Sequence, residues 1–231
     1  TNPDVGTLTY VVNTGMADPT GTIPANIEKS DLEANGVCHD QRSGRKGPAV
    51  KSGASDIKDG ETKTLLLSEN VHRDTQNSSV NVSWLGPVQT QPLTPKGNDP
   101  ALNATMTTNP EQRFGMTWFY EKGGDPFDPP ENKFQPINLD DENLTDGDYS
   151  GEGMRFARPA SVHPEVFIVA FCGGNTKEIS TDIDYRVYQQ LMTPNGMKAA
   201  LYNFPNQSIE QYERTANGKG FMTPPLNEGD Y

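Results

Sequence analysis

The residues best suited to nucleophilic or metal chemistry are two cysteines, Cys38 and Cys172, and the neighbours of the first. Cys38 precedes His39 and Asp40, and a thiol beside an imidazole can become a nucleophile or bind a metal. Structural zinc sites, however, show Cys-x-x-Cys or paired histidines at set spacing, which this segment lacks. The sequence favours a disulfide between Cys38 and Cys172 over zinc, although two buried free thiols would give the same cysteine count.

Nine residues separate His163 from Gly173, and His163 stands at the start of a segment with strong strand character. Nine strand residues span about 30 Å, so the imidazole of His163 and the thiol of Cys172 must lie at opposite ends. We expect His163 to be structural, with its imidazole bonded to a backbone carbonyl. The chain also lacks the Gly-x-Ser-x-Gly and His-Glu-x-x-His motifs and a phosphate-binding glycine loop. We therefore predict that it is not an enzyme.

Carboxylates and glycines gather in residues 140–153, as they do in loops that bind hard cations. The candidate calcium ligands are Asp140, Asp141, Asp146 and Asp148. Their spacing does not fit the EF-hand pattern, because Leu144 and Gly153 would stand at ligand positions. A solvated acidic loop is the ordinary outcome for such a run of charge, and Ca²⁺ is the one cofactor that the sequence leaves open.

Three aromatic residues, Trp84, Trp118 and Tyr120, lie on segments with strand character. If they pointed outward, their rings could stack on a sugar and form a glycan-binding surface. Aromatic residues in β-rich domains are mostly core residues, and we expect these to be buried.

The chain of 231 residues carries a formal charge of −12 and has a pI near 4.6. Such an acidic surface repels phosphate backbones, so nucleic acid is excluded as a partner. The longest uninterrupted apolar run, residues 166–172, is far shorter than the roughly 20 residues that span a bilayer. The chain begins at Thr1 rather than Met, so processing or trimming is expected, and any signal or anchor would lie upstream.

Strands dominate the elements that must position these residues. Residues 7–13 predict a strand that ends in a turn at Thr14-Gly15, and residues 64–68 predict a strand buried on both faces after a turn at Asp59-Gly60. Residues 80–85 alternate apolar and polar side chains, and residues 113–121 form an aromatic strand. Long segments rich in Pro, Gly, Asn or acidic residues separate them, which predicts insertions at 86–112 and 122–153.

The clearest local prediction is a hairpin of residues 166–171 and 176–180, with Gly173-Gly174 supplying positive φ angles in its turn. The first arm is apolar on both faces, so each face needs cover.

A helix follows the hairpin, with Thr181 or Asp182 as its N-cap, and it ends at Pro194. Its apolar positions, Ile183, Val187 and Leu191, recur at helical spacing. One short helix can cover only part of the apolar surface of several strands that are apolar on both faces. We therefore expect that a larger helix on the N-terminal side is missing from a single domain spanning residues 1–231.

Several segments resemble the prepilin-type family abundant in planctomycete bacteria. Residues 57–69, which include Asp59-Gly60, are similar to the family's Asp-Gly-Thr-Ser-Asn-Thr-Leu-Leu segment. Residues 158–196 resemble its C-terminal hallmark, a His followed by nine residues and Asp-Gly. His163 matches the His, and Gly173-Gly174 stands at Asp-Gly, so the carboxylate of the pattern is replaced by glycine. This departure puts in doubt any role that depends on that carboxylate.

The resemblance implies an α+β, pilin-like head whose antiparallel sheet normally packs against a long N-terminal helix. Such proteins are similar to type IV pilins and to the pseudopilins of type II secretion, which implies a structural subunit of a surface fibre. The expected partners are other pilin-like subunits, and the precursor would be anchored in the inner membrane before reaching the cell surface. The alternative is a secreted or surface module that binds a glycan or solute and forms no polymer.

Overall fold

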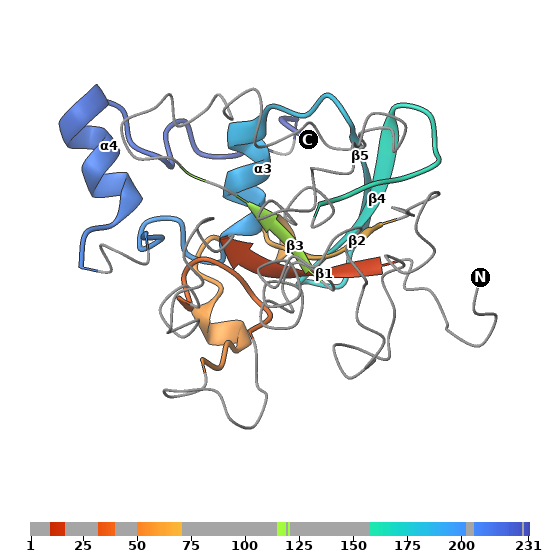
Figure 1. Ribbon diagram of the computed structural model, residues 1–231, viewed down its shortest axis with the longest axis horizontal. Coiled ribbons are helices and arrows are strands. Elements are labelled where there is room, and N and C mark those ends of the chain that lie inside the picture. The colour runs from red at the N-terminus through yellow and green to blue at the C-terminus, as the bar shows by residue number, and fades with distance from the viewer. Residues whose placement is uncertain are drawn as a thin grey trace, which may run out of the picture.

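The computed structural model describes residues 10–16, 32–39, 50–70, 115–118, 120, 158–201, 206–227 and 229–231. Within them, the chain is an α+β fold with a five-stranded sheet in the order β3-β1-β2-β4-β5 (Figure 1). The strands are β1 (Tyr10–Met16), β2 (Leu65–Glu69), β3 (Gly115–Trp118), β4 (Val166–Phe171) and β5 (Thr176–Ser180). The helices are α3 (Tyr185–Met192) and α4 (Ile209–Asn217), with short 3-10 helices η2 (Ala54–Asp56) and η3 (Glu61–Lys63).

The sheet is mixed, so the prediction of an antiparallel sheet is wrong at one pair of strands. β1 pairs with β3 in parallel, whereas β1–β2, β2–β4 and β4–β5 are antiparallel. A parallel pair needs a crossover connection of a dozen or more residues. Residues 70–114 separate β2 from β3, which is ample length for the chain to return on the far side of β1.

β1 continues beyond the predicted turn at Thr14-Gly15 and reaches Met16. Its pairing with β3 shifts register between Asn13 and Gly15, where Gly15 has φ 88°. A Cβ atom on Gly15 would lie 2.8 Å from the carbonyl oxygen of Asn35. The glycine therefore allows a bulge inside the strand at a point where another backbone approaches closely.

The predicted hairpin is confirmed, because β4 and β5 cover residues 166–171 and 176–180. Only Gly174 has a positive φ, 84°, so the expectation that both glycines take this conformation is wrong. The Gly174 N–H donates to the Phe171 carbonyl at 2.9 Å, and the Phe171 N–H donates to the Asn175 carbonyl at 2.9 Å. This is a three-residue loop that needs one left-handed residue.

α3 begins after Asp184, whose side chain accepts a hydrogen bond from the Arg186 N–H at 2.8 Å. The cap predicted at Thr181 or Asp182 is therefore two or three residues too early. Val187 and Leu191 are buried, as their helical spacing predicts.

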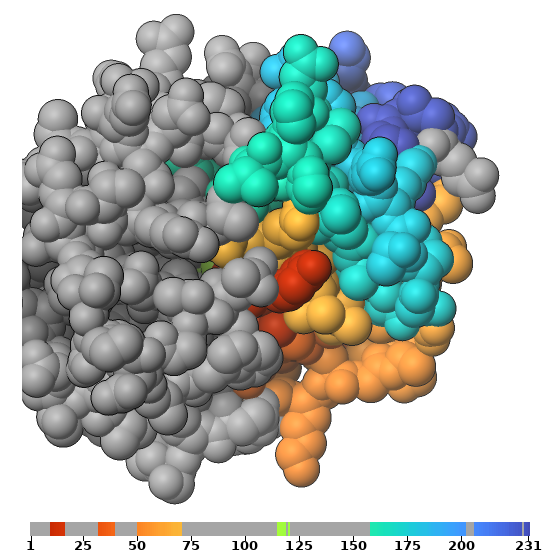
Figure 2. Space-filling view, turned by 90° about the vertical axis from the view of Figure 1, so that its right-hand side faces the viewer, coloured from red at the N-terminus to blue at the C-terminus, as the bar shows by residue number. Residues whose placement is uncertain are grey.

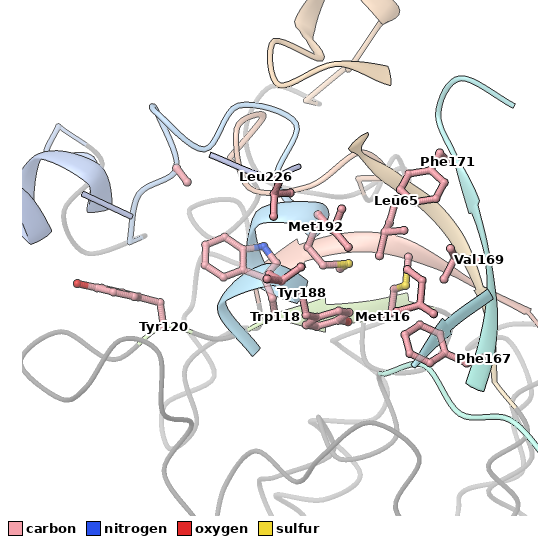
Figure 3. Close-up of a cluster of buried hydrophobic side chains, with 14 of the residues drawn as sticks. Leu65, Met116, Trp118, Tyr120, Phe167, Val169, Phe171, Tyr188, Met192 and Leu226 are labelled. Carbon is pink, nitrogen blue, oxygen red and sulfur yellow. The ribbon is translucent and has the colours of Figure 1, made fainter. Parts of the chain in front are cut away.

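The core lies between α3 and one face of the sheet (Figure 3). On β4, Phe167, Val169 and Phe171 all point into it, and each is at most 1% exposed. Trp118 of β3 is also buried and stacks on Phe221, with ring centroids 5.8 Å apart. The alternation along β4 thus assigns one face of the strand to the core and the other to the outside.

Two asparagines are buried within this apolar core. The Asn13 amide of β1 donates to the Leu65 carbonyl at 2.8 Å and to the Met192 carbonyl at 2.7 Å, which joins the sheet to the end of α3. Asn35 bonds both backbone groups of Ala200 through its side chain, at 2.8 and 3.0 Å. Its own carbonyl accepts the Trp118 indole N–H at 2.7 Å. These bonds connect segments that are remote in the sequence.

The predicted insertions at 86–112 and 122–153 and the predicted strand at 80–85 lie outside the described residues. The single domain over 1–231 stays a prediction. In the part of the chain that is described, neither helix is long and apolar enough to cross a bilayer.

We predict that Asn13→Ala lowers the free energy of unfolding by about 2–4 kcal/mol, because two buried carbonyls lose their donor. Urea denaturation measures this change. Asn206→Ala, at an exposed position, is the matched control and should change stability by less than about 0.5 kcal/mol. Equal effects of the two substitutions would contradict the structural role of Asn13.

Candidate functional site

The Asp59-Gly60 turn is fastened to the loop that follows α3. The N–H groups of Lys58 and Asp59 donate to the Pro194 carbonyl at 2.7 and 3.1 Å. In return, the Asp59 carboxylate accepts the Gly196 N–H at 2.6 Å. Burial raises the pKa of Asp59 above its ordinary value, and the bond from Gly196 opposes this rise. Asp59 therefore acts as a structural clamp between two loops.

The two turns singled out by the family resemblance, at Asp59-Gly60 and at Gly173-Gly174, lie at the same end of the sheet. Gly60 has φ 104°, and its carbonyl accepts the Thr64 hydroxyl at 3.1 Å. The next residue, Glu61, accepts the Gly173 N–H on its carbonyl at 2.9 Å. A Cβ atom on Gly173 would lie 3.2 Å from the Thr62 side chain. The residues just after Asp59-Gly60 thus contact Gly173, and residues 59–64 and 173–174, remote in sequence, are together called the turn cluster.

Both cysteines lie beside this turn cluster, and in the structure their sulfur atoms are free thiols that form no disulfide. The Cys172 N–H donates to the Thr64 carbonyl at 2.9 Å, and the Cys38 N–H donates to the Asn13 carbonyl at 2.8 Å. Burial raises the pKa of both thiols, that of Cys172 to about 11, and the charge of Cys38 adds to the rise at Cys172. The sulfur atoms are therefore close enough to influence each other, and both are protonated at neutral pH.

His163 lies near the opposite end of β4, as its distance along the strand predicts. Its Nε2 atom is 3.6 Å from the Glu69 carboxylate, so the expected partner, a backbone carbonyl, is replaced by an acidic side chain. The same carboxylate accepts the Ile168 N–H at 3.0 Å. His163 is thus separated from Gly173-Gly174 by the length of β4 and takes no part in the turn cluster.

The face of the sheet turned away from α3 is apolar in its centre. Residues that pair directly across strands have side chains on the same face of the sheet. Val12 pairs with Leu67, and Leu67 pairs with Ala170. Val11 and Val169, their sequence neighbours, point into the core, so these three side chains lie on the outer face. The side chains at the centre of this outer face are Val12, Leu67, Val166, Ile168 and Ala170. All of them are half-buried, and none belongs to the described hydrophobic core.

Polar and exposed residues border this apolar strip. On β5 the outward residues are Thr176, Glu178 and Ser180, and all are exposed. At one end of the strip, Tyr10, the first residue of β1, is 48% exposed and pairs with Glu69. In Figure 2, red atoms of β1 lie next to yellow atoms of the β2 region, with teal atoms of the chain from residue 158 onward close by. The face predicted to need cover is therefore covered only in part by the folded chain.

The proposed aromatic platform does not form from the residues that are described. Trp118 and Tyr120 are 1% and 3% exposed, which confirms that they are core residues. Trp84 and the candidate calcium ligands Asp140, Asp141, Asp146 and Asp148 lie outside the described residues. In the described part, no three His, Cys, Asp or Glu side chains converge as a metal site would require.

Sequence reasoning missed α4 and its two buried carboxylates. Glu210 accepts the Arg214 Nε–H at 2.5 Å and the Met222 N–H at 2.8 Å. Glu213 accepts hydrogen bonds from Asn217, at 2.6 Å, and from the Tyr120 hydroxyl, which points away from the main cluster in Figure 3. Ser208 before the helix and Gly218 after it were the available signals. Each carboxylate is fully engaged, as a buried structural charge must be.

Together, the fold and these contacts define an α+β domain with a core on one face of its sheet and an apolar strip on the other. The family model SBP_bac_10, described as a protein of unknown function (DUF1559), matches residues 4–186. The chain belongs to this family. No curated protein and no solved structure matches the chain.

We predict that Asp59→Asn makes the protein less sensitive to rising pH. An acid whose pKa is raised on folding holds its proton longer in the folded state, so stability falls as pH rises above the ordinary value of 3.8. Asparagine keeps an oxygen for the Gly196 N–H but carries no charge. Thermal unfolding from pH 4 to 7 should show the variant gaining stability relative to the wild type. Asp182→Asn controls for the charge, and a pH-independent difference at Asp59 would contradict the prediction.

Proposed function

We propose that this chain is the non-catalytic head of a pilin-like structural subunit, assembled into a type IV pilus-like or type II pseudopilus-like surface fibre. The observation that carries the proposal is the apolar strip on the outer face of the sheet. Five half-buried apolar side chains outside the core represent surface that an isolated monomer has little reason to keep. Such a strip is typical of a surface that another element covers.

The dimensions of the strip suit one α-helix. The strip lies on three adjacent strands, β1, β2 and β4. Neighbouring strands are spaced by about 4.8 Å, so the axes of β1 and β4, on either side of β2, lie about 10 Å apart. An α-helix with its side chains is about 10–12 Å across. The exposed polar side chains of β5 then limit the covered area on one side. A long apolar N-terminal helix, as in the prepilin-type family that the sequence resembles, is the occupant we propose.

This proposal sets the partners and the location of the protein. The precursor would be held in the inner membrane by the N-terminal helix, and neighbouring pilin-like subunits would then pack through the same helices at the cell surface. The acidic surface, with a net charge of −12, argues against nucleic acid as a partner. No catalytic role is proposed for the turn cluster, because its contacts fasten loops together.

A second candidate is a surface module that binds a glycan or solute without forming a polymer. The observation that favours it is the name of the matching family model, SBP_bac_10, which points to a binding module. Equilibrium binding of the purified chain to a glycan array and a solute panel tests this candidate. Saturable binding by a protein that forms no filaments would support it over the fibre.

The fibre proposal predicts that Ile168→Lys, made in the full-length protein, removes the subunit from surface filaments. The lysine can pair with Glu178 across the strands, so the head should stay folded, but a helix covering the strip would bury its charge. We expect the subunit in sheared filaments to fall by at least about tenfold, measured by quantitative mass spectrometry and electron microscopy.

Ser180→Lys is the matched control, since it adds the same charge to the same face at an exposed position of β5. It should leave filament incorporation unchanged. Wild-type incorporation of Ile168→Lys would refute the proposed helix contact. A wild-type protein found only as a soluble monomer without an anchor would refute the fibre itself.

A further inference from the structure

Cys38 and Cys172 are the only two cysteines of the chain, and the fold brings them to the same end of the sheet. Cys38 is held by the carbonyl of Asn13 on β1, and Cys172 by the carbonyl of Thr64, immediately before β2. β1 and β2 are neighbours, and the Asn13 amide also donates to Leu65, the residue after Thr64, at 2.8 Å. The two anchoring points therefore lie side by side.

This arrangement brings the two cysteines toward each other, as a disulfide requires. The two Cα atoms of a disulfide lie within about 7 Å of each other, and the backbone groups that hold Cys38 and Cys172 belong to chain segments spaced by about 4.8 Å. Both cysteines are half-buried, so they are not sealed in the core. Cys38 also contributes to the raised pKa of Cys172, as expected for neighbouring thiols.

We propose that Cys38 and Cys172 are a redox modification site, at which a disulfide forms by exchange with an external protein disulfide and fastens the 32–39 segment to the β4–β5 turn. The structure shows the dithiol form of this site. The inference is independent of the fibre proposal, because it concerns thiol chemistry within one chain.

The exchange balances without any cofactor. The thiolate of one cysteine attacks a sulfur of the donor disulfide and displaces the first donor thiolate. The thiolate of the second cysteine then attacks the mixed disulfide and displaces the second donor thiolate. The chain loses two protons and two electrons, and the donor becomes a dithiol by accepting them.

The burial of the two thiols gives the site a kinetic property. Because the pKa of Cys172 is raised to about 11, its thiolate is scarce in the folded protein at neutral pH. Small-molecule oxidants therefore react slowly with the folded dithiol. Disulfide exchange with a dedicated partner protein, during or soon after folding, is the faster way to form the bond.

The disulfide would hold a segment on which the core depends. Residue 35 lies in this segment, and Asn35 links it to Ala200 and to Trp118 of β3 through three hydrogen bonds. A bond at Cys38 fixes the segment three residues further along. The long loop between residues 38 and 172 makes the expected stabilisation large, because the cross-link removes much of the freedom of the unfolded chain.

The test compares the full chain refolded in the presence of a protein disulfide donor with the full chain refolded under reducing conditions. We expect the oxidised chain to lose both free thiols, to stay monomeric, and to show a peptide cross-link joining residues 38 and 172 on mass spectrometry. Its melting temperature should exceed that of the reduced chain by about 5–15 °C.

Cys38→Ser and Cys172→Ser are the controls, and each should abolish the difference between the oxidised and reduced melting temperatures. If a variant fails to fold, the thiol count and cross-link map of the wild type still decide the question. Two thiols that persist under the donor, or cross-links only between chains, would overturn the proposal. Neither result bears on filament assembly, which the outer-face substitutions test separately.

Discussion

Two buried asparagines supply the contacts on which the packing of this domain depends. Backbone groups taken out of water must be paired, and the ends of α3 and β2 leave carbonyls that no strand partner reaches. The Asn13 amide satisfies two of them, and Asn35 satisfies both groups of Ala200. Because a buried amide left without partners is costly, these side chains fix the relative position of the sheet, α3 and the 32–39 segment. Apolar packing alone is less directional and would not specify this arrangement.

The two ends of β4 are held by different sets of contacts. At one end, the turn cluster and the cysteines bind the β4–β5 loop to the turn before β2, through Glu61 and Thr64. At the other end, Glu69 holds both His163 and the backbone of β4. Both ends thus keep β2 and β4 in register. Between these two ends, the outer face of the sheet carries the apolar side chains of Val12, Leu67, Val166, Ile168 and Ala170.

The buried glutamates of α4 show how a very acidic chain manages charge in its interior. Glu210 and Glu213 are at most 2% exposed, yet each has two hydrogen-bond donors. Gly220 makes this possible, because a Cβ atom there would lie 2.1 Å from the Glu210 carboxylate. The tight packing of a glycine against a carboxylate is a tertiary feature, and helix periodicity alone assigns both glutamates to the solvent face.

The sequence by itself determined the local elements whose signals are short in range. The β4–β5 hairpin follows from apolar alternation and paired glycines, and α3 follows from the spacing of Val187 and Leu191. Tertiary structure alone decided the parallel pairing of β1 with β3, the burial of Asn13, and the meeting of Asp59 with Gly196. These depend on contacts between residues far apart in the chain. Local propensity carries no information about which remote backbone group a side chain will reach, and so one sequence pattern fits several topologies.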